Sequence, residues 1–244
     1  IVHIFPHFHY LVIMHYKKIV KGTFIDRPNR FIAHVEINGL IETVHVKNTG
    51  RCKELLIPGC TVVMEDFRKR LGFESRKTQF DLIAVYKKTD KDEILINMDS
   101  QLPNKVVMEW LEQLPPQEAY DFIKPEYTYG NSRVDFYMEK KTSVGIKKYL
   151  MEVKGCTLEQ NDIGYFPDAP TERGVKHLHE LAAACKQGYK CFLAFVIQIP
   201  GVTQVLPNKK THPEFAHALE MAKAVGVEIL YLQCNVKEDE VVII

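Results

Sequence analysis

Alternating apolar and polar positions predict a strand-rich first part of the chain. Residues 31–37 alternate, with Phe31, Ala33, Val35 and Ile37 on one face, and residues 40–46 return with a similar pattern. Asn38-Gly39 between them supplies the two residues with positive φ that a tight hairpin turn requires. The same reasoning predicts further strands at 19–25, 61–66, 80–86 and 93–97.

A short helix is predicted between the third and fourth strands, within TGRCKELLIPG. Thr49 can cap its start, and Pro58-Gly59 ends it. Five or so short strands with one short helix in this place are typical of an OB-type β-barrel, although periodicity alone does not separate it from other small barrels. We therefore predict an OB-type barrel domain over residues 16–100.

From residue 101 the pattern changes to helices that alternate with buried strands. An amphipathic helix is predicted at 103–113, with Asn104 as its cap. Residues 123–139 predict a strand or hairpin, and KKTSVGIKK at 140–148 reads as a linker of mixed charge. The remaining elements are strands at 149–156, 191–199 and 227–232 and helices at 171–186 and 214–225. This order predicts an α/β layer with a mixed sheet over residues 101–244.

The amino-acid composition excludes several classes of protein. The 244 residues carry 32 Lys and Arg against 31 Asp and Glu, and 46% are apolar, which excludes a disordered or uniformly basic chain. The six cysteines are scattered without a CxxC pair, so neither a zinc ribbon nor a disulfide framework is predicted. Reduced thiols fit a cytoplasmic protein.

The apolar N-terminus predicts neither a membrane span nor a signal peptide. Residues 1–14 are shorter than the roughly 20 residues that cross a bilayer, and they lack a basic leader and a cleavage site. Met14 looks like a natural start, so we expect residues 1–13 to come from upstream translation or a misassigned start. Residues 1–15 are treated as an extension outside the two domains.

Charge is divided unequally between the two parts of the chain. Residues 1–102 hold 16 Lys and Arg against 12 Asp and Glu, whereas residues 103–244 hold 16 against 19. A basic rim on a small barrel suits a phosphate backbone; the alternative is that these side chains belong to solvated loops. The candidate nucleic-acid contacts of the barrel are Arg27, Arg30, Lys47, Arg51 and Lys53, and the 66–79 connection adds Arg68, Lys69, Arg70, Arg76 and Lys77.

The residues with the clearest chemistry are Asp135 and the triplet Glu152-Val153-Lys154. Two carboxylates on adjacent strands can bind a hard cation such as Mg²⁺ or Mn²⁺. A lysine two residues after Glu152 shares its strand face and can stabilise charge on a phosphate. This D…(D/E)xK arrangement is found in metal-dependent nucleases, but ExK triplets also form ordinary ion pairs in strands.

Four further residues are candidates for the same site. Glu109 on the preceding helix is either a third metal ligand or a solvent-facing residue. Arg173 and His177 lie one helical turn apart, and they either face the site and contact phosphate or pair with carboxylates. Arg133 lies in a polar stretch before Asp135 and is a candidate nucleic-acid contact.

Longer blocks resemble the sugar fermentation stimulation protein A family. They include VHVKNTGRCKELLIPG, INMDSQLPNKVVMEWL, YGNSRVDF, EVKGCTLE and FPDAPTERGVKHLHEL, within a resemblance from about Tyr16 to about Asp239. It implies an OB-type domain followed by a PD-(D/E)XK nuclease-like domain, DNA binding, and a role in bacterial sugar (maltose) metabolism. It assigns the nuclease-type residues to Asp135, Glu152 and Lys154, with Glu109 as a candidate fourth. The chain departs from the pattern in having Val134, not proline, before Asp135.

Three functions are compatible with these observations. The first is a DNA-binding protein with a Mg²⁺-dependent phosphodiesterase site, and the second is a DNA-binding regulator that does not cleave. The third is an OB-type binder of RNA or another polyanion such as an oligosaccharide. No helix-turn-helix pattern is evident, so we predict DNA binding with little sequence preference. The oligomeric state is left open, a homodimer included.

Overall fold

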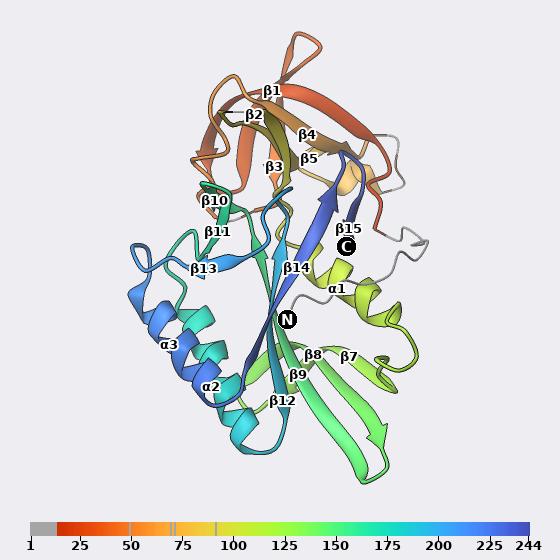
Figure 1. Ribbon diagram of the computed structural model, residues 1–244. Helices are drawn as coiled ribbons and strands as arrows, with labels where there is room; N and C mark the ends of the chain where they lie inside the picture. The colour runs from red at the N-terminus through yellow and green to blue at the C-terminus, as the bar shows by residue number, and fades with distance from the viewer. Residues whose placement is uncertain (1–13, 49, 69, 71, 91) are drawn as a thin grey trace.

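The computed structural model describes residues 14–48, 50–68, 70, 72–90 and 92–244, and it has a β-barrel followed by an α/β domain (Figure 1). The expected extension at 1–13 and the expected cap Thr49 lie outside the described residues. His15 forms a bridge with Glu240, and the Tyr16 amide donates to the Asp239 carbonyl at 2.8 Å. The first described residues therefore pack against the end of the chain.

The barrel confirms the OB-type prediction. Its sheet has the order β3-β2-β1-β4-β5-β6, and a parallel pairing of β3 with β5 closes it. Asn38 and Gly39 have φ of 52° and 79°, as the predicted hairpin turn requires. The strands are β1 (Ile19–Asn29), β2 (Ile32–Ile37), β3 (Leu40–Val46), β4 (Thr61–Asp66), β5 (Phe80–Lys88) and β6 (Glu93–Asn97).

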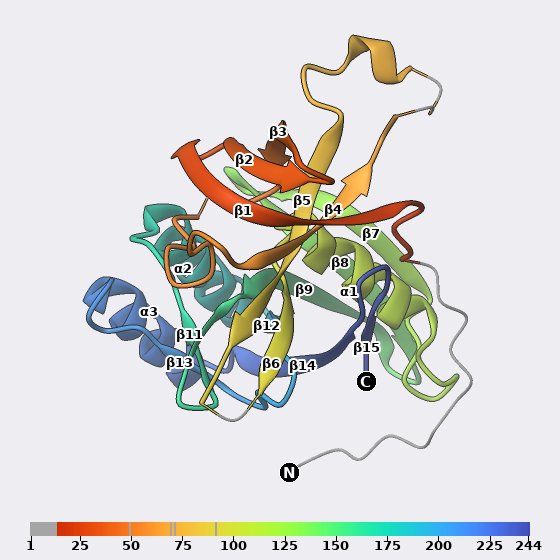
Figure 2. The same cartoon turned by 90° about the horizontal axis from the view of Figure 1, so that it is seen from above.

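The short helix predicted between β3 and β4 is wrong. The described residues of this segment form successive turns, in which the amides of Leu55 and Leu56 both donate to the Cys52 carbonyl. Cys52 has a φ of 45°, a left-handed conformation that a right-handed helix cannot contain. A one-turn 3₁₀ helix, η1 (Phe73–Ser75), lies instead in the connection from β4 to β5, which projects from the molecule in Figure 2.

The α/β domain confirms the predicted mixed sheet, whose order is β15-β14-β12-β9-β8-β7. Strands β9, β12 and β14 are parallel, and β7, β8 and β15 are antiparallel to their neighbours. A separate three-stranded sheet has the order β10-β11-β13. The elements are α1 (Leu102–Glu112), β7 (Phe122–Tyr129), β8 (Ser132–Thr142), β9 (Gly145–Cys156), β10 (Leu158–Gln160), β11 (Ile163–Phe166), α2 (Glu172–Lys186), β12 (Lys190–Ile197), β13 (Val205–Pro207), α3 (Pro213–Ala224), β14 (Glu228–Val236) and β15 (Val241–Ile243).

Helices cover both faces of this sheet. Helices α2 and α3 lie on one side and α1 on the other (Figure 1). Leu178 and Leu181 of α2 pack with Leu150 of β9, while Val106 and Val107 of α1 pack with the opposite face. Strand β9 is therefore buried on both faces along its second half, so the polar side chains that it carries there need a specific partner.

The predicted linker at 140–148 is a β-hairpin. Pairing continues from Glu139↔Lys148 through Lys140↔Lys147 to Thr142↔Gly145. Lys141, Lys147 and Lys148 are exposed because this end of the hairpin extends beyond the helices that cover the sheet (Figure 1). Their charge hid the alternation by which a half-buried strand is recognised.

A buried polar network joins the barrel to the α/β domain. Asp99, which is fully buried, accepts from Tyr16 Oη at 3.1 Å and forms an ion pair of 2.6 Å with Lys47. Asn97 donates to Tyr16 Oη at 3.2 Å and accepts from Gln198 Nε2 at 2.9 Å. Residues from both domains thus satisfy one another's polar groups at their interface.

None of the six cysteines forms a disulfide. In the described part of the chain, no helix is long and apolar enough to cross a membrane.

Candidate functional site

The ladder between β8 and β9 opens where Asp135 and Glu152 lie. Regular pairing ends at Phe136↔Met151, and beyond it the Val153 amide donates to Asp135 Oδ2 at 2.7 Å. Continuing the same register would set Asp135 opposite Glu152. The two carboxylates therefore come from facing positions on neighbouring strands, at a point where the strands separate.

Two donors hold Asp135. Besides the Val153 amide, Asn104 Nδ2 donates to Asp135 Oδ1 at 2.8 Å. Burial raises the pKa of Asp135, and the negative charge of Glu152 raises it further. A cation between the two carboxylates would favour their charged forms and so lower the pKa of Asp135 again.

Asn104 does not cap α1, contrary to the prediction. Gln101 is the N-cap and makes no side-chain cap hydrogen bond. Asn104 lies in the first turn of the helix, where its amide reaches Asp135. The sequence carries no signal for this contact, because it depends on how α1 crosses β8.

Glu152 has one engaged and one unsatisfied carboxylate oxygen. The residue is 2% exposed, and its Oε1 contacts both Lys154 Nζ and His177 Nδ1. Burial acts to raise the pKa of Glu152, but the His177 hydrogen bond and the Lys154 charge together lower it. Its Oε2 is buried and finds no hydrogen-bond partner among the residues that the structure describes. An unsatisfied buried carboxylate oxygen is costly, which points to an ion or ligand at this position.

Helix α2 places His177 and Arg173 at the same site. Thr171 caps the helix, accepting from the Gly174 amide at 3.1 Å, so the predicted helix start is confirmed. Arg173 Nε donates to His177 Nε2 at 3.3 Å. Because an arginine Nε–H can only donate, His177 must carry its proton on Nδ1, which donates to Glu152.

This geometry decides between the two interpretations of His177. Both of its ring nitrogens are engaged and the residue is 5% exposed, so it pairs with a carboxylate and does not present itself to phosphate. The predicted nucleic-acid contact is thus not what the structure shows for His177. Arg173 is exposed and lies beside the site.

The structure does not bring Glu109 to the acid pair. It lies five positions after Asn104, which turns it by roughly 140° around α1. Its carboxylate accepts from the backbone amide of Met14, and burial raises its pKa. Within the described residues, no group of three or more His, Cys, Asp and Glu side chains is arranged to hold a metal. Of the three predicted metal ligands, the structure brings Asp135 and Glu152 together.

Four of the predicted barrel cations gather around a surface cleft of about 280 Å³, which we call the basic cleft. Arg30, Arg51 and Lys53 are exposed there. Arg27 also lines the basic cleft, but its guanidinium donates to the carbonyls of Arg30, Asn48, Gly50 and Arg51 at 2.6–2.9 Å. Arg27 therefore shapes the loop, and the other three cations face solvent.

Lys47 is not part of this basic cleft. Its side chain is 10% exposed and is paired with the buried Asp99. Lys47 directly follows β3, and its pair with Asp99 directs it to the domain interface and not to the rim, so this contact does not support the predicted role in nucleic-acid binding.

Four of the remaining predicted cations are compensated by carboxylates, whereas Lys77 is exposed and Lys69 lies outside the described residues. In the projecting β4–β5 connection, Arg68 pairs with Asp66 at 3.0 Å, Arg70 with Glu65 at 2.9 Å, and Arg76 with Asp81. Arg133 pairs with Glu126 at 2.5 Å in an exposed position. Because carboxylates neutralise them, these cations contribute less positive potential at the protein surface than the number of Lys and Arg residues suggests.

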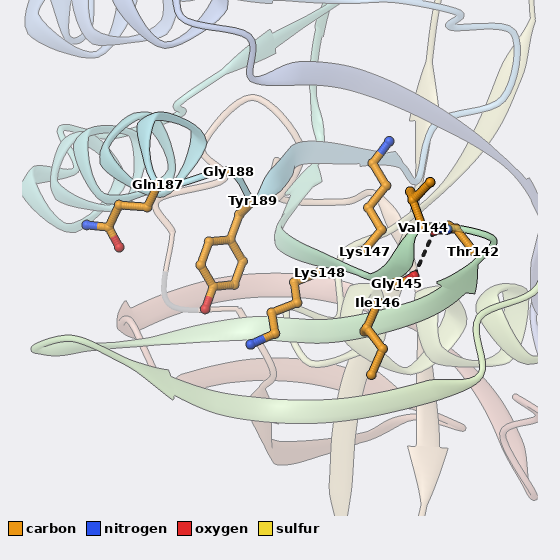
Figure 3. A pocket seen from close by; sticks show the side chains of 9 residues that line it. All are labelled: Thr142, Val144, Gly145, Ile146, Lys147, Lys148, Gln187, Gly188 and Tyr189. Carbon is orange, nitrogen blue, oxygen red and sulfur yellow. Dashed lines mark hydrogen bonds between the residues drawn. The ribbon is translucent and has the colours of Figure 1, made fainter.

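A larger cleft of about 640 Å³ lies at the end of the β8–β9 hairpin. Figure 3 shows Lys148 beside Tyr189, while Lys147 points to the other side of the hairpin. Lys148 is four residues before Glu152, or roughly 13 Å along the strand. The carboxylate pair does not line this cleft.

Comparisons with known proteins agree with the two-domain architecture. Residues 25–97 match the family model described as SfsA N-terminal OB domain, and residues 101–240 match sugar fermentation stimulation protein RE domain. A sugar fermentation stimulation protein homolog of Desulfitobacterium hafniense (strain Y51) is 52% identical over 228 residues, covering 93% of this chain and 94% of that protein. The homolog of Ruminiclostridium cellulolyticum is 52% identical over 225 residues, with 92% and 94% covered.

A solved structure resembles the whole chain. The structure of Pyrococcus furiosus SfsA in complex with Ca²⁺ superposes with a TM-score of 0.80 at 27% identity, and 96% of each chain is covered.

Proposed function

The chain belongs to the sugar fermentation stimulation protein family, and from that premise we propose that it binds DNA or RNA with little sequence preference and cleaves phosphodiester bonds with a divalent cation. The observation that carries the proposal is the facing pair Asp135 and Glu152, with Lys154 beside it and with a buried Glu152 Oε2 that has no hydrogen-bond partner among the described residues. The exposed cations of the basic cleft support binding of a phosphate backbone.

The site has the donor set of a hard divalent cation. Carboxylate oxygens are the ligands that Mg²⁺ and Mn²⁺ prefer, and Glu152 Oε2 is an oxygen with no other partner among the described residues. The Ca²⁺ complex of the Pyrococcus furiosus protein supports a divalent cation in this family. When bound, such a cation polarises a phosphodiester and lowers the pKa of a bound water.

The side chains around the pair have separate roles in this proposal. Lys154 supplies a positive charge to a phosphate oxygen or orients the attacking water. His177 and Lys154 both hold Glu152 Oε1, so that Oε2 is the oxygen left for the cation. Arg173 fixes the His177 tautomer and is a positioning residue.

Cleavage assays test the proposal directly. Purified protein is incubated with single- and double-stranded DNA and RNA in Mg²⁺, Mn²⁺ or EDTA. We expect cleavage with either ion, none in EDTA, and none for Asp135→Asn, which preserves the shape of the side chain. Binding without cleavage in every ion would support the non-catalytic regulator of sugar (maltose) metabolism, and absence of binding would contradict both.

Reversing two cations of the basic cleft should weaken nucleic-acid binding. We expect Arg51→Glu with Lys53→Glu to lower affinity roughly tenfold or more and to reduce the slope of log K against log salt by about 2. Titrations of labelled DNA over a range of salt concentrations measure both quantities. The matched control is Lys147→Glu with Lys148→Glu at the far end of the β8–β9 hairpin. Equal losses in the two variants would remove the basic cleft from the proposal.

His177→Gln should weaken cation binding without unfolding the protein. Removing a group that orients a metal ligand costs about 10- to 100-fold in metal affinity. Calorimetric titration with Mn²⁺ measures this loss independently of cleavage. The control is His179→Gln, because His179 is an exposed histidine on the same helix. Identical Mn²⁺ affinities in the two variants would show that His177 does not position Glu152.

A further inference from the structure

A third cleft, of about 350 Å³, lies between the barrel and the α/β domain; we call it the interdomain cleft. Asn48, Gly50 and Ser100 line it from the first domain and its connection, and Thr157, Asp168 and Gln198 line it from the second. Gly155, the residue after Lys154 in β9, lines it as well. Its volume is at the lower end of the range of about 300–1,000 Å³ that is usual for small-molecule sites.

Gln198 presents an unpartnered acceptor to the interdomain cleft. The residue is 1% exposed, and its Nε2 donates to Asn97 Oδ1 at 2.9 Å and to the Asp99 carbonyl at 3.3 Å. These bonds fix the amide, and over the described ranges no donor reaches Oε1. A Cβ at Gly155 would lie 2.7 Å from this oxygen, so the glycine leaves Oε1 accessible from that side.

Asp168 presents a second acceptor. Its carboxylate has no hydrogen bond or ion pair with any residue whose position is described, and a Cβ at Gly50 would lie 2.3 Å from Oδ2. The loop that carries Asp168 is held in place, since Asn208 donates from Nδ2 to the Pro167 carbonyl at 3.1 Å and from its amide to the Phe166 carbonyl at 2.8 Å. Phe166 also packs against Phe195 and Phe215. The backbone that precedes Asp168 is therefore held in place, and its carboxylate is free to accept from a ligand.

The interdomain cleft adjoins the basic cleft. Gly50 lines both, so a ligand can place one group in each. The basic cleft, with Arg30, Arg51 and Lys53, suits a phosphate. The interdomain cleft, with two unpartnered acceptors, suits a group that carries N–H donors.

We propose that the two clefts together bind one nucleotide with an unpaired guanine base. The phosphate lies against the exposed cations, and the guanine lies in the interdomain cleft, where the Asp168 carboxylate accepts from ring N–H and exocyclic amino groups. This inference rests on the proposed binding of nucleic acid and adds a base preference at one nucleotide position, while the rest of the strand is bound through its backbone without regard to sequence. Because base pairing occupies the same edge of guanine, the ligand is a free nucleotide or a single-stranded segment, not an intact duplex.

Binding of single-stranded oligonucleotides tests the inference. Fluorescence anisotropy in EDTA compares a short oligothymidine with the same strand carrying one central guanosine. We expect the wild-type protein to bind the guanosine strand about five- to tenfold more tightly. Competition by GMP against TMP then distinguishes recognition of a free nucleotide from recognition within a strand.

Asp168→Asn separates base recognition from general electrostatics. Removing a negative charge near phosphates should tighten binding of every strand, as in the control Glu36→Gln at an exposed barrel position. Loss of a base acceptor should instead abolish the preference for guanosine. The carboxylate has no described partner to lose, so we expect an unchanged melting temperature for this variant.

The outcomes are distinguishable. Equal binding of both strands by the wild-type protein, or a preference that persists in Asp168→Asn, would overturn the inference and leave the proposed function intact. Failure of the wild-type protein to bind any nucleic acid would overturn both.

Discussion

Lys154→Ala is expected to lower the rate of phosphodiester cleavage by about 10²- to 10³-fold, the usual loss when one preorganised group that stabilises charge is removed. Lys154 Nζ contacts Glu152 Oε1 in a part of the sheet that is buried on both faces. Its removal takes away the positive charge beside the acid pair and one of the two groups that hold Glu152. Single-turnover cleavage with saturating protein measures the effect on chemistry alone.

The same strand offers a matched control. Lys148 lies on the same face of β9 but is exposed and distant from the acid pair, so Lys148→Ala should cleave at close to the wild-type rate. Nucleic-acid affinity should change little in Lys154→Ala, because Lys154 is paired with Glu152 and the proposed phosphate contacts lie in the basic cleft. Cleavage by Lys154→Ala at the wild-type rate would exclude Lys154 from the site.

Asp99→Ala is expected to reduce the free energy of unfolding by about 3–5 kcal/mol, the loss found when one partner of a buried ion pair is removed. The substitution leaves the Lys47 ammonium in a nearly enclosed position without its counter-charge. It also removes an acceptor of the Tyr16 hydroxyl. Denaturant unfolding followed by tryptophan fluorescence and circular dichroism measures the loss.

The control is Asp26→Ala, which breaks the exposed pair of Asp26 with His34 on the barrel surface. Exposed ion pairs contribute about 0–1 kcal/mol, so this variant should unfold close to the wild type. A loss of less than 1 kcal/mol for Asp99→Ala would mean that Lys47 reaches solvent when its partner is absent.

The barrel strands could be predicted because apolar–polar alternation and turn residues are signals that extend over only a few residues. The bounds of β3, β4 and β6 agree with the prediction, and the Asn38-Gly39 turn between β2 and β3 is confirmed. The hairpin at 140–148 was missed because lysines on both faces hide its period. The helix after β3 was wrong because the left-handed conformation of Cys52 depends on contacts that a propensity cannot express.

The candidate site could be predicted only where the geometry of a β-strand determines the direction of its side chains. Glu152 and Lys154 share a face because they are two residues apart on one strand, and they are in contact in the structure. The positions of Asn104 and His177 depend on how α1 and α2 cross the sheet, which residue spacing does not encode. Lys47 was misread because a cation at a strand end looks the same in sequence whether it faces solvent or a buried carboxylate.

The position of Gln198 bears on where a bound nucleic-acid strand would be cleaved. Its amide lines the interdomain cleft and also belongs to the buried network that joins the two domains. A hinge motion of the barrel against the α/β domain would break those bonds, so they oppose a change in the separation between the basic cleft and the acid pair. A nucleic-acid strand bound by the barrel would then be cleaved at a constant distance from the bound nucleotide, and its products would share one length.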